Sequence, residues 1–252
     1  MKGVQRHSLI KALYSTLPHG SPFDLDDLKS VDVSAKLAAR YVESGWLVRL
    51  GHGVYAFPGD TLGLHGCIKL LQKRTDGLHI AGKSALALQG VRHNIGVREQ
   101  VVLWGDLRFV LPEWFVSRFS ARYSHSQLFH WRDATQARKS LGTPPGVMDG
   151  LLVSIPERAV LEMLAEAGRS QGMEEARNIF DGFRSPRVEI LGNLLTRCTR
   201  IKAVRLFLTW ARETQVVDVD HLLASYEIPV GSGSRWMTRL KDGTLLSLKP
   251  NG

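Results

Sequence analysis

The first seventeen residues carry apolar side chains at helical spacing. Leu9, Ile10, Leu13 and Leu17 fall on one face, which predicts a helix over residues 5–17. The prolines and glycine that follow would end this helix, because proline lacks the backbone N–H that a helix interior needs. The chain is therefore expected to open with an amphipathic helix that packs on the residues after it.

Two further helices are predicted before residue 45. Asp24 can cap a short acidic helix over residues 24–28, and Ser34 can cap a third helix that ends at Ser44. Gly45 stops the third helix, because glycine readily adopts the left-handed conformation with which many helices end. The amino-terminal part of the chain thus predicts three short helices in succession.

The third predicted helix has an apolar side and a cationic side. Lys36 and Arg40 lie four positions apart and project together from one side, with Ser34 at the exposed start of the helix. An ordinary solvated helix face is the alternative interpretation of such a pair. The opposite, buried side is formed by four residues: Leu37, Ala38, Tyr41 and Val42.

A short hairpin follows the third helix directly. Residues 46–50 and 54–58 predict two strands, joined by a turn around His52. Helices followed by such a hairpin are typical of a recognition helix and wing, in which the helix enters the major groove and the wing lies along the duplex. The DNA-binding residues predicted on this basis are Ser34, Lys36, Arg40 and Tyr41 in the helix and Arg49 and His52 in the wing.

The rest of the chain mixes helical and extended patterns. The predicted strands are residues 101–104, 107–112, 115–123 and 151–155, and a terminal hairpin pairs 236–240 with 244–248. The predicted helices are residues 65–74, 84–90, 154–168, 173–183, 187–197 and 201–213. The fold class is therefore α+β: a winged helix-turn-helix domain over residues 1–60, a linker over 60–66, and a larger mixed α/β C-terminal domain within 61–252.

One helix start in the second domain has a strong local signature. Ser154 is placed to cap the helix, Pro156 stands at an early position where its missing N–H is harmless, and Glu157 can complete a capping box. The sequence therefore predicts that both polar side chains serve this helix end.

The positive charge is concentrated in the middle of the chain. The sequence has 33 basic and 24 acidic residues, a net charge of +9, which favours polyanionic partners. Residues 1–60 contain 7 basic and 6 acidic residues. Residues 61–148 contain 12 basic and 5 acidic residues, and residues 149–252 contain 14 basic and 13 acidic residues. The excess indicates that the middle segment also meets phosphate or an acidic partner. A smaller basic cluster is interpreted as a solvated surface, with contact to DNA or a partner as the alternative: Arg197, Arg200, Lys202 and Arg205.

The spacing of a phosphate-binding loop is met by Gly77-Leu-His-Ile-Ala-Gly82-Lys83-Ser84. Such a loop needs a buried strand before it, and residues 69–76 form a polar helical pattern instead. The favoured interpretation is a turn that leads a helix of small residues into close packing. Nucleotide binding is the alternative.

Other catalytic chemistry has little support. No histidine or cysteine spacing is typical of a metal site, and Cys67 and Cys198 are too isolated for a disulfide framework. Asp242 and Lys249 resemble part of a nuclease core, but Ser247 stands where a second acid is needed. We therefore expect no catalytic residue, no metal and no cofactor. The protein is predicted not to be an enzyme. With no signal peptide and no run that spans a bilayer, it is predicted to be cytoplasmic with no membrane partner.

Taken in order, several segments resemble the AbiEi family, the antitoxin and transcriptional-regulator half of bacterial abortive-infection toxin–antitoxin operons. Each segment is modest alone, but together they extend over nearly the whole chain. The matching segments are residues 45–59, 82–90, 111–114, 154–162, 202–208 and 228–233.

The resemblance implies a type IV antitoxin with two domains. The winged helix would bind repeats in the double-stranded promoter DNA of its own operon and repress transcription. The C-terminal domain would neutralise a nucleotidyltransferase-like toxin, and the resemblance leaves direct contact with that toxin open. Two alternatives remain from the residues alone. One is a nucleic-acid-processing enzyme with a nuclease-like or nucleotide-binding C-terminal domain. The other is a repressor whose larger domain binds a small molecule.

Overall fold

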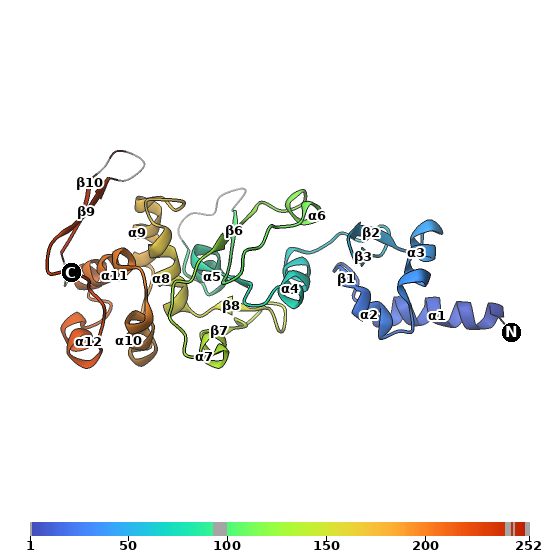
Figure 1. Ribbon diagram of the computed structural model, residues 1–252, viewed down its shortest axis with the longest axis horizontal. Coiled ribbons are helices and arrows are strands. Elements are labelled where there is room, and N and C mark those ends of the chain that lie inside the picture. Colours follow the sequence, from blue (N-terminus) through green and yellow to red (C-terminus); the bar gives the residue numbers. More distant parts are fainter. Residues whose placement is uncertain (1, 93–99, 240–242, 244, 250–252) are drawn as a thin grey trace. The chain divides into compact units, whose positions relative to one another are not determined.

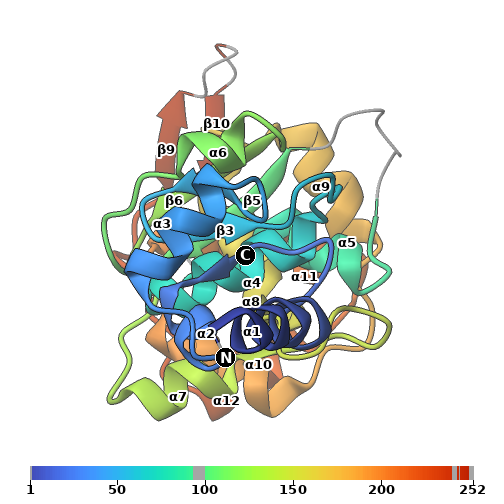
Figure 2. The same ribbon diagram turned by 90° about the vertical axis from the view of Figure 1, so that its right-hand side faces the viewer.

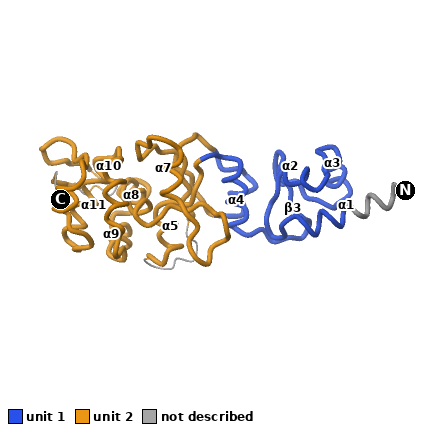
Figure 3. The backbone as a smooth tube through the Cα atoms, turned by 90° about the horizontal axis from the view of Figure 1, so that it is seen from below, with its two compact units in different colours: residues 1–76, 110–119 blue, residues 77–109, 120–252 orange. Residues whose placement is uncertain are grey.

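The computed structural model describes residues 2–92, 100–239, 243 and 245–249, and it comprises two units. Residues 1–76 and 110–119 form the first unit, and residues 77–109 and 120–252 form the second (Figure 3). Both contain helices and sheets, so the predicted α+β class is confirmed. The boundary predicted at residue 60 falls inside the first unit, which continues through one further helix and takes in a short segment from later in the chain.

The first unit contains the predicted succession of three helices and a hairpin (Figure 1). The three strands form an antiparallel sheet in the order β1-β3-β2, which leaves β2 at an edge. The strands of this unit are β1 (Phe23–Asp24), β2 (Val48–Gly51) and β3 (Val54–Ala56). Its helices are α1 (Lys2–Thr16), α2 (Leu25–Lys29), α3 (Ala35–Glu43), α4 (Leu64–Arg74) and α6 (Glu113–Val116).

A reciprocal capping box fixes the start of α2. The Asp24 carboxylate accepts the backbone N–H groups of Asp26 and Asp27 at 2.9 and 3.0 Å. The Asp27 carboxylate in turn accepts the N–H of Asp24 at 2.9 Å. These bonds satisfy amides that have no partner within the helix, and a cap of this kind is worth about 1 kcal/mol. The predicted cap at Asp24 is confirmed.

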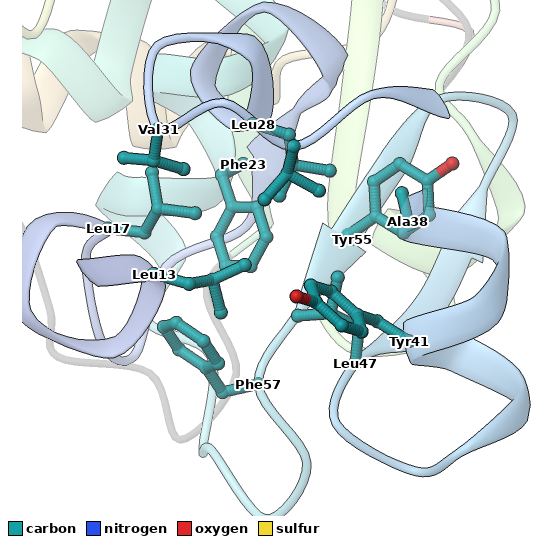
Figure 4. Close-up of a cluster of buried hydrophobic side chains, with 11 residues drawn as sticks. Leu13, Leu17, Phe23, Leu28, Val31, Ala38, Tyr41, Leu47, Tyr55 and Phe57 are labelled. Atoms are coloured by element: carbon teal, nitrogen blue, oxygen red, sulfur yellow. The ribbon is translucent and has the colours of Figure 1, made fainter. Parts of the chain in front are cut away.

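An apolar core joins the helices of the first unit to its sheet. Figure 4 shows these side chains converging from α1, α2, α3 and the strands. Burying one such leucine or phenylalanine contributes about 1.5–3 kcal/mol, so the core dominates the energetics of this unit. Its buried members are Leu13, Leu17, Phe23, Leu28, Val31, Val33, Ala38, Tyr41, Leu47, Tyr55 and Phe57.

Residues 60–66 are anchored, which corrects their interpretation as a linker. The Asp60 carboxylate accepts the backbone N–H of Gly20 at 2.7 Å, and the N–H of Gly63 donates to the Gly20 carbonyl at 2.8 Å. Helix α4 then begins at Leu64. The loop after α1 thus holds the start of α4, which explains why the first unit extends beyond residue 60.

The second unit is built around a five-stranded mixed sheet in the order β6-β5-β4-β8-β7. Figure 1 labels its strands β6, β7 and β8, and Figure 2 labels β5 and β6. Strand β4 pairs antiparallel with β5 and parallel with β8, so segments far apart in the chain meet at its centre. Helices α5 (Gly82–Leu88) and α8 (Pro156–Glu166) pack against each other and both contact β8. The sheet strands are β4 (His79–Ile80), β5 (Val101–Gly105), β6 (Ala121–His125), β7 (Leu141–Gly142) and β8 (Val153–Ser154).

The helices of the second unit follow the predicted pattern over residues 156–214. Two of them, α7 and α12, were not predicted. The terminal hairpin is confirmed, with β9 (Trp236–Arg239) paired to β10 (Leu245–Leu248). Within the described residues, no helix combines the length and apolar character required to cross a bilayer. The helices are α5 (Gly82–Leu88), α7 (Ala134–Lys139), α8 (Pro156–Glu166), α9 (Met173–Asp181), α10 (Val188–Arg197), α11 (Ile201–Thr214) and α12 (Val219–Ser225).

The strands predicted over residues 107–112 and 115–123 are largely wrong. The described structure has no strand over residues 107–112, and β6 begins only at Ala121. Helix α6 lies between them because Pro112 occupies its N-cap position, and Trp114 and Phe115 are both buried from this single turn. Phe115, at the start of the second predicted strand, therefore lies in a helix.

The capping box predicted for α8 is also wrong. Ile155 occupies the N-cap position and no side chain caps the helix, although Pro156 does stand in its first turn. The Ser154 hydroxyl points into the core, where it donates to the Glu162 carboxylate at 2.8 Å. Glu157 instead accepts from the side chain and backbone of Arg187 at 2.7–2.9 Å. Hydrogen bonds to other parts of the fold therefore replace both of the bonds expected from the capping box.

A buried guanidinium holds the carboxyl-terminal part of the second unit. Arg205 on α11 is 1% exposed and donates to the backbone carbonyls of Val230, Ser232 and Ser234 at 2.7, 2.5 and 2.8 Å. A longer bond of 3.4 Å reaches the carbonyl of Leu248 in β10. Arg205 was predicted to lie in a solvated cluster, so its burial is a correction.

Candidate nucleic-acid interface

Helix α3 is held at both ends by local signals that the sequence contains. The Ser34 side chain accepts the backbone N–H of Leu37 at 3.3 Å, which caps the start of the helix. Gly45 follows the helix with a φ of +76°, a conformation that L side chains rarely adopt. The N–H groups of Trp46 and Leu47 both donate to the Tyr41 carbonyl, at 2.8 and 3.2 Å. The chain therefore leaves α3 in one defined direction toward the hairpin.

Tyr41 was predicted as a DNA contact, and its position corrects that prediction. The side chain is 0% exposed and lies within the core cluster (Figure 4). Its place on the apolar side of α3 follows from the helical spacing with Ala38. A side chain that is fully buried cannot reach a nucleic acid. Tyr41 orients the helix from beneath and does not touch a ligand.

The other five predicted residues all lie on the surface of the first unit. Ser34, Lys36 and Arg40 are exposed on α3, and Arg49 and His52 are exposed on the hairpin. Within the described part of the chain, no acidic side chain forms an ion pair with Lys36, Arg40 or Arg49. Their charges are thus available to an external anion.

The hairpin has a defined shape at its tip. Strands β2 and β3 pair antiparallel, with a register shift between Arg49 and Gly51 that marks a bulge. Gly53 adopts a φ of +65°, and a side chain on Gly51 would come within 3.0 Å of the Trp114 ring. Glycine is therefore favoured on both sides of His52, at position 53 by its conformation and at position 51 by the close approach of the Trp114 ring. The Arg49 side chain lies along the tip and donates to the Gly51 carbonyl at 3.3 Å.

Two cations of α4 support this surface, and the sequence reasoning missed both. The Arg74 guanidinium donates twice to the His52 carbonyl, at 3.2 Å in each case, and so holds the hairpin turn. The Lys73 ammonium bridges the Asp24 and Asp27 carboxylates at 2.8 Å. Burial by itself would raise the pKa of Asp24, but the hydrogen bonds from Lys73 and the backbone N–H of Asp27 bring its pKa below the usual value. Only the bias of cations toward the last turn of this helix hinted at such a role.

Two apolar side chains on the hairpin are also exposed. Trp46 and Val48 are 41% and 43% exposed on or just before the edge strand β2. Trp46 packs edge-on against Tyr14 at a centroid distance of 6.2 Å, so its ring is held while part of it remains accessible. Sequence reasoning treated both positions only as strand formers.

The loop with phosphate-binding spacing has its polar groups occupied by protein partners. The backbone N–H of Gly82 donates to a Glu162 carboxylate oxygen at 3.0 Å, where a phosphate oxygen would otherwise accept. The Lys83 ammonium donates to Glu175 at 2.7 Å, and the Ser84 hydroxyl accepts a backbone N–H of β5 at 2.9 Å. The packing interpretation of this loop fits its contacts, because Gly82 also lies directly against the backbone of α8.

A buried polar network surrounds Glu162, which is 0% exposed. Its carboxylate accepts from Arg158 Nε at 2.7 Å and lies 3.0 Å from Nε2 of His79, in addition to its bonds with Ser154 and Gly82. Burial would raise the pKa of Glu162, but the charge of Arg158, the ring of His79 and the Gly82 N–H together lower it to about 2. Residues from three parts of the chain thus meet at one anion.

The remaining candidate residues do not form a second site. Within the described residues, no group of three or more potential ligands is placed to hold a metal ion. Asp242 lies outside the described residues. Cys67 and Cys198 are both buried thiols, and burial raises the pKa of each to about 11, which keeps them protonated. Lys202 is half-buried and donates to the Ala167 carbonyl at 2.5 Å, so the basic cluster around it is not one open surface.

Comparison with known families covers almost the entire chain. Residues 6–97 match the sequence model described as "Transcriptional regulator, AbiEi antitoxin N-terminal domain". Residues 98–249 match the model described as "Transcriptional regulator, AbiEi antitoxin, Type IV TA system". The chain belongs to the AbiEi antitoxin family.

The AbiEi fold is also seen in a solved structure. The RV2827C protein from Mycobacterium tuberculosis is 19% identical, and the match covers 91% of this chain and 87% of that one with a TM-score of 0.56. At this identity the likeness concerns the fold. A search of curated proteins finds no match.

The AbiEi resemblance inferred from sequence is confirmed, and two of its segments now have a structural explanation. Gly82 and Lys83 come from one segment, and Ser154, Arg158 and Glu162 come from another. In the fold, Gly82 joins the residues of the second segment around one buried carboxylate. These motifs of the AbiEi chain therefore contribute to the architecture of the second unit.

Proposed function

We propose that this AbiEi protein represses its own operon by binding repeats in the promoter. The first unit acts as a winged helix: α3 enters the major groove, and the β2–β3 hairpin follows the backbone or the minor groove. Residues 1–60 contribute the DNA-contacting surface, and α4 supports it. Membership in a family of transcriptional regulators supports this role.

The observation that carries the proposal is the division of α3 into two sides. Ala38 and Tyr41 are buried in the core, whereas Lys36 and Arg40 are exposed and free of described acidic partners. A helix that is packed from one side and cationic on the other, with a hairpin next to it, has the arrangement needed for a duplex. The bonds that fix the helix ends make this surface rigid before DNA binds.

The role of the second unit is proposed from the family. It neutralises a nucleotidyltransferase-like toxin encoded beside this protein, as expected of a type IV antitoxin. The second unit contains 22 basic and 16 acidic residues, a net charge of +6. The first unit contains 11 basic and 8 acidic residues, a net charge of +3. We extend the proposal to phosphate contacts by the second unit that add to those of the hairpin.

Operator binding by point variants tests the first role. A labelled duplex spanning the promoter of the protein's own operon is titrated with wild type, Arg40→Ala and Arg49→Ala. Loss of a base contact by Arg40 should weaken binding about tenfold or more. Loss of a phosphate contact by Arg49 should weaken binding to all duplexes and lower the salt slope by about one. Lys11→Ala is the matched control, because Lys11 is an exposed cation of the same unit that belongs to α1 and not to α3 or the hairpin.

The outcome that rejects this placement is wild-type affinity for both arginine variants, with circular dichroism showing that they are folded. Toxin neutralisation is tested separately by co-expression with the neighbouring gene. Deletion at residue 60 would cut through the first unit, so the double variant Arg40→Ala, Arg49→Ala is the better reagent. We expect it to lose repression and retain neutralisation.

The nucleotide-binding alternative receives no support from the contacts of its loop. The Gly82 N–H and the Lys83 ammonium would each have to leave a carboxylate before they could bind phosphate. Breaking the Gly82–Glu162 contact alone would cost a buried, charge-assisted hydrogen bond. We therefore propose a regulator and do not propose a nucleotide-dependent enzyme.

A further inference from the structure

A pocket of about 310 Å³ lies in the second unit between α7 and α10. Its apolar walls come from Trp131, Ile155, Ile190 and Leu194. Ile190 and Leu194 are four positions apart on α10, so one face of that helix forms a continuous wall. A concave site of this size with apolar walls and a few polar groups is typical of a small-molecule pocket.

One polar group in the wall has no partner. The side-chain oxygen Oε1 of Gln136 is buried, and among the described residues nothing donates a hydrogen bond to it. Gln136 lies on α7 and lines the pocket. A buried acceptor without a donor costs about 1–3 kcal/mol, so such groups usually mark a bound water or ligand. A ligand N–H or O–H that reached this oxygen would supply the missing hydrogen bond.

The charged residues of the pocket favour an anion. Lys139 and Arg197 stand on α7 and α10, whereas Glu189 is the acidic residue among those that line the pocket. Neither cation forms an ion pair with an acidic side chain of the described chain. Arg197 donates to the Asn193 carbonyl at 2.8 Å, which holds its guanidinium over the pocket-forming face of α10.

We propose that this pocket binds a small anion that combines an apolar ring with an N–H. The ring packs between α7 and α10 against the apolar walls, and its N–H donates to Gln136. A single anionic group is held by Lys139 and Arg197. Each feature of the ligand follows from a separate observation: the apolar walls, the unpartnered acceptor and the excess of cations. The proposal concerns the second unit alone and goes beyond the DNA-binding role of the first.

The pocket is connected to the buried network of Glu162. Ser140 lines it and accepts a hydrogen bond from the Arg158 guanidinium at 2.9 Å. The same guanidinium lies 5.6 Å from the ring centroid of Trp131, another wall residue. A ligand in the pocket thus touches residues that hold Arg158 in place. Binding should raise the melting temperature of the full-length protein, because the ligand binds only the folded state.

Calorimetric titration of the full-length protein with three indoles tests the charge preference. Indole-3-acetate has a planar ring, an N–H and a carboxylate; indole-3-ethanol is its neutral match, and tryptamine is its cationic match. We expect indole-3-acetate to bind about tenfold more tightly than the neutral compound, and tryptamine to bind least. Lys139→Gln should remove the tenfold preference, whereas Arg138→Gln, an exposed cation of the same helix outside the pocket, should leave it intact.

A matched probe that lacks the ring N–H tests the role of Gln136 as the acceptor. 1-Methylindole-3-acetate lacks the ring N–H, so wild type should bind it about tenfold more weakly than indole-3-acetate. In Gln136→Leu the two compounds should bind equally. Ile190→Trp, which fills the pocket from a half-buried position, should abolish binding, and the Gln136 comparison remains decisive if that variant does not fold.

Three results would overturn the proposal. The first is the absence of saturable binding of indole-3-acetate to wild type. The second is an equal effect of the Lys139 and Arg138 substitutions. The third is an unchanged ratio between the methylated and unmethylated probes in Gln136→Leu.

Discussion

Replacing Glu162 with glutamine should destabilise the second unit by about 3 kcal/mol. Glutamine has nearly the same shape, but Glu162→Gln removes the charge and replaces one of two accepting oxygens with an NH₂ donor that faces another donor. The fold lowers the pKa of this carboxyl from 4.5 to about 2. A shift of that size corresponds to about 3 kcal/mol in favour of the charged form. Breaking a buried ion pair typically costs about 3–5 kcal/mol, because the remaining charge stays buried, here on Arg158.

The same shift predicts how stability depends on acidity. The folded carboxyl has the lower pKa, so the folded protein binds fewer protons than the unfolded chain as the pH falls. The contribution of Glu162 is therefore complete above about pH 5 and is lost between 4.5 and about 2. Glu162→Gln should be less stable than wild type at pH 7 and should approach it as the pH falls through this window.

Urea unfolding followed by circular dichroism measures both effects. With a typical slope of about 1–3 kcal/mol/M, the midpoint at pH 7 should fall by about 1–3 M. Glu213→Gln is the matched control, because Glu213 is 52% exposed and pairs with Arg177 at the surface. Such a pair is worth less than about 1 kcal/mol. Equal midpoints for the Glu162 and Glu213 variants, or a gap from wild type that does not close in acid, would refute the reasoning.

Three further substitutions probe the first unit. Arg74→Ala should weaken operator binding several-fold with the fold retained, because the His52 carbonyl loses both hydrogen bonds from Arg74. Unchanged affinity in anisotropy titrations would exclude this role. Asp24→Ala removes the α2 cap and a partner of Lys73, so thermal denaturation should show a loss of about 1–2 kcal/mol, and no loss would mean that the cap is dispensable. Gly45→Ala should cost about 1 kcal/mol in the same assay through its φ of +76° alone, since no atom lies within 4 Å of an added Cβ; Gly45→Asn should cost less, and the reverse order would contradict the conformational argument.

The features that were predictable from sequence depend on near neighbours in the chain. The caps at Asp24 and Ser34 and the stop at Gly45 involve partners within three residues, so their spacing is visible in the sequence. The division of α3 into two sides follows from helical periodicity in the same way. Periodicity even placed Tyr41 on the buried side, and assigning it to DNA overrode that signal.

The features that sequence reasoning missed depend on contacts between distant segments. Glu162 accepts from an amide 80 positions away, and Arg74 holds a carbonyl 22 positions away. Ser154 and Glu157 carry the letters of a capping box, yet burial of both makes their tertiary partners worth more than a local cap. Local spacing does not show whether such a side chain caps its own helix or instead binds a distant residue that the fold brings close.

The hydrogen bonds from Arg205 to backbone carbonyls have a consequence for the carboxyl-terminal hairpin. Among the described residues, the hydrogen bonds that its guanidinium donates all go to main-chain oxygens, which every residue type possesses. The hydrogen bonds to Val230, Ser232 and Ser234 therefore depend on the path of the backbone and not on the side chains of these residues. The exposed faces of β9 and β10 can therefore change in sequence, provided that Arg205 and the buried side chain of Leu248 are kept.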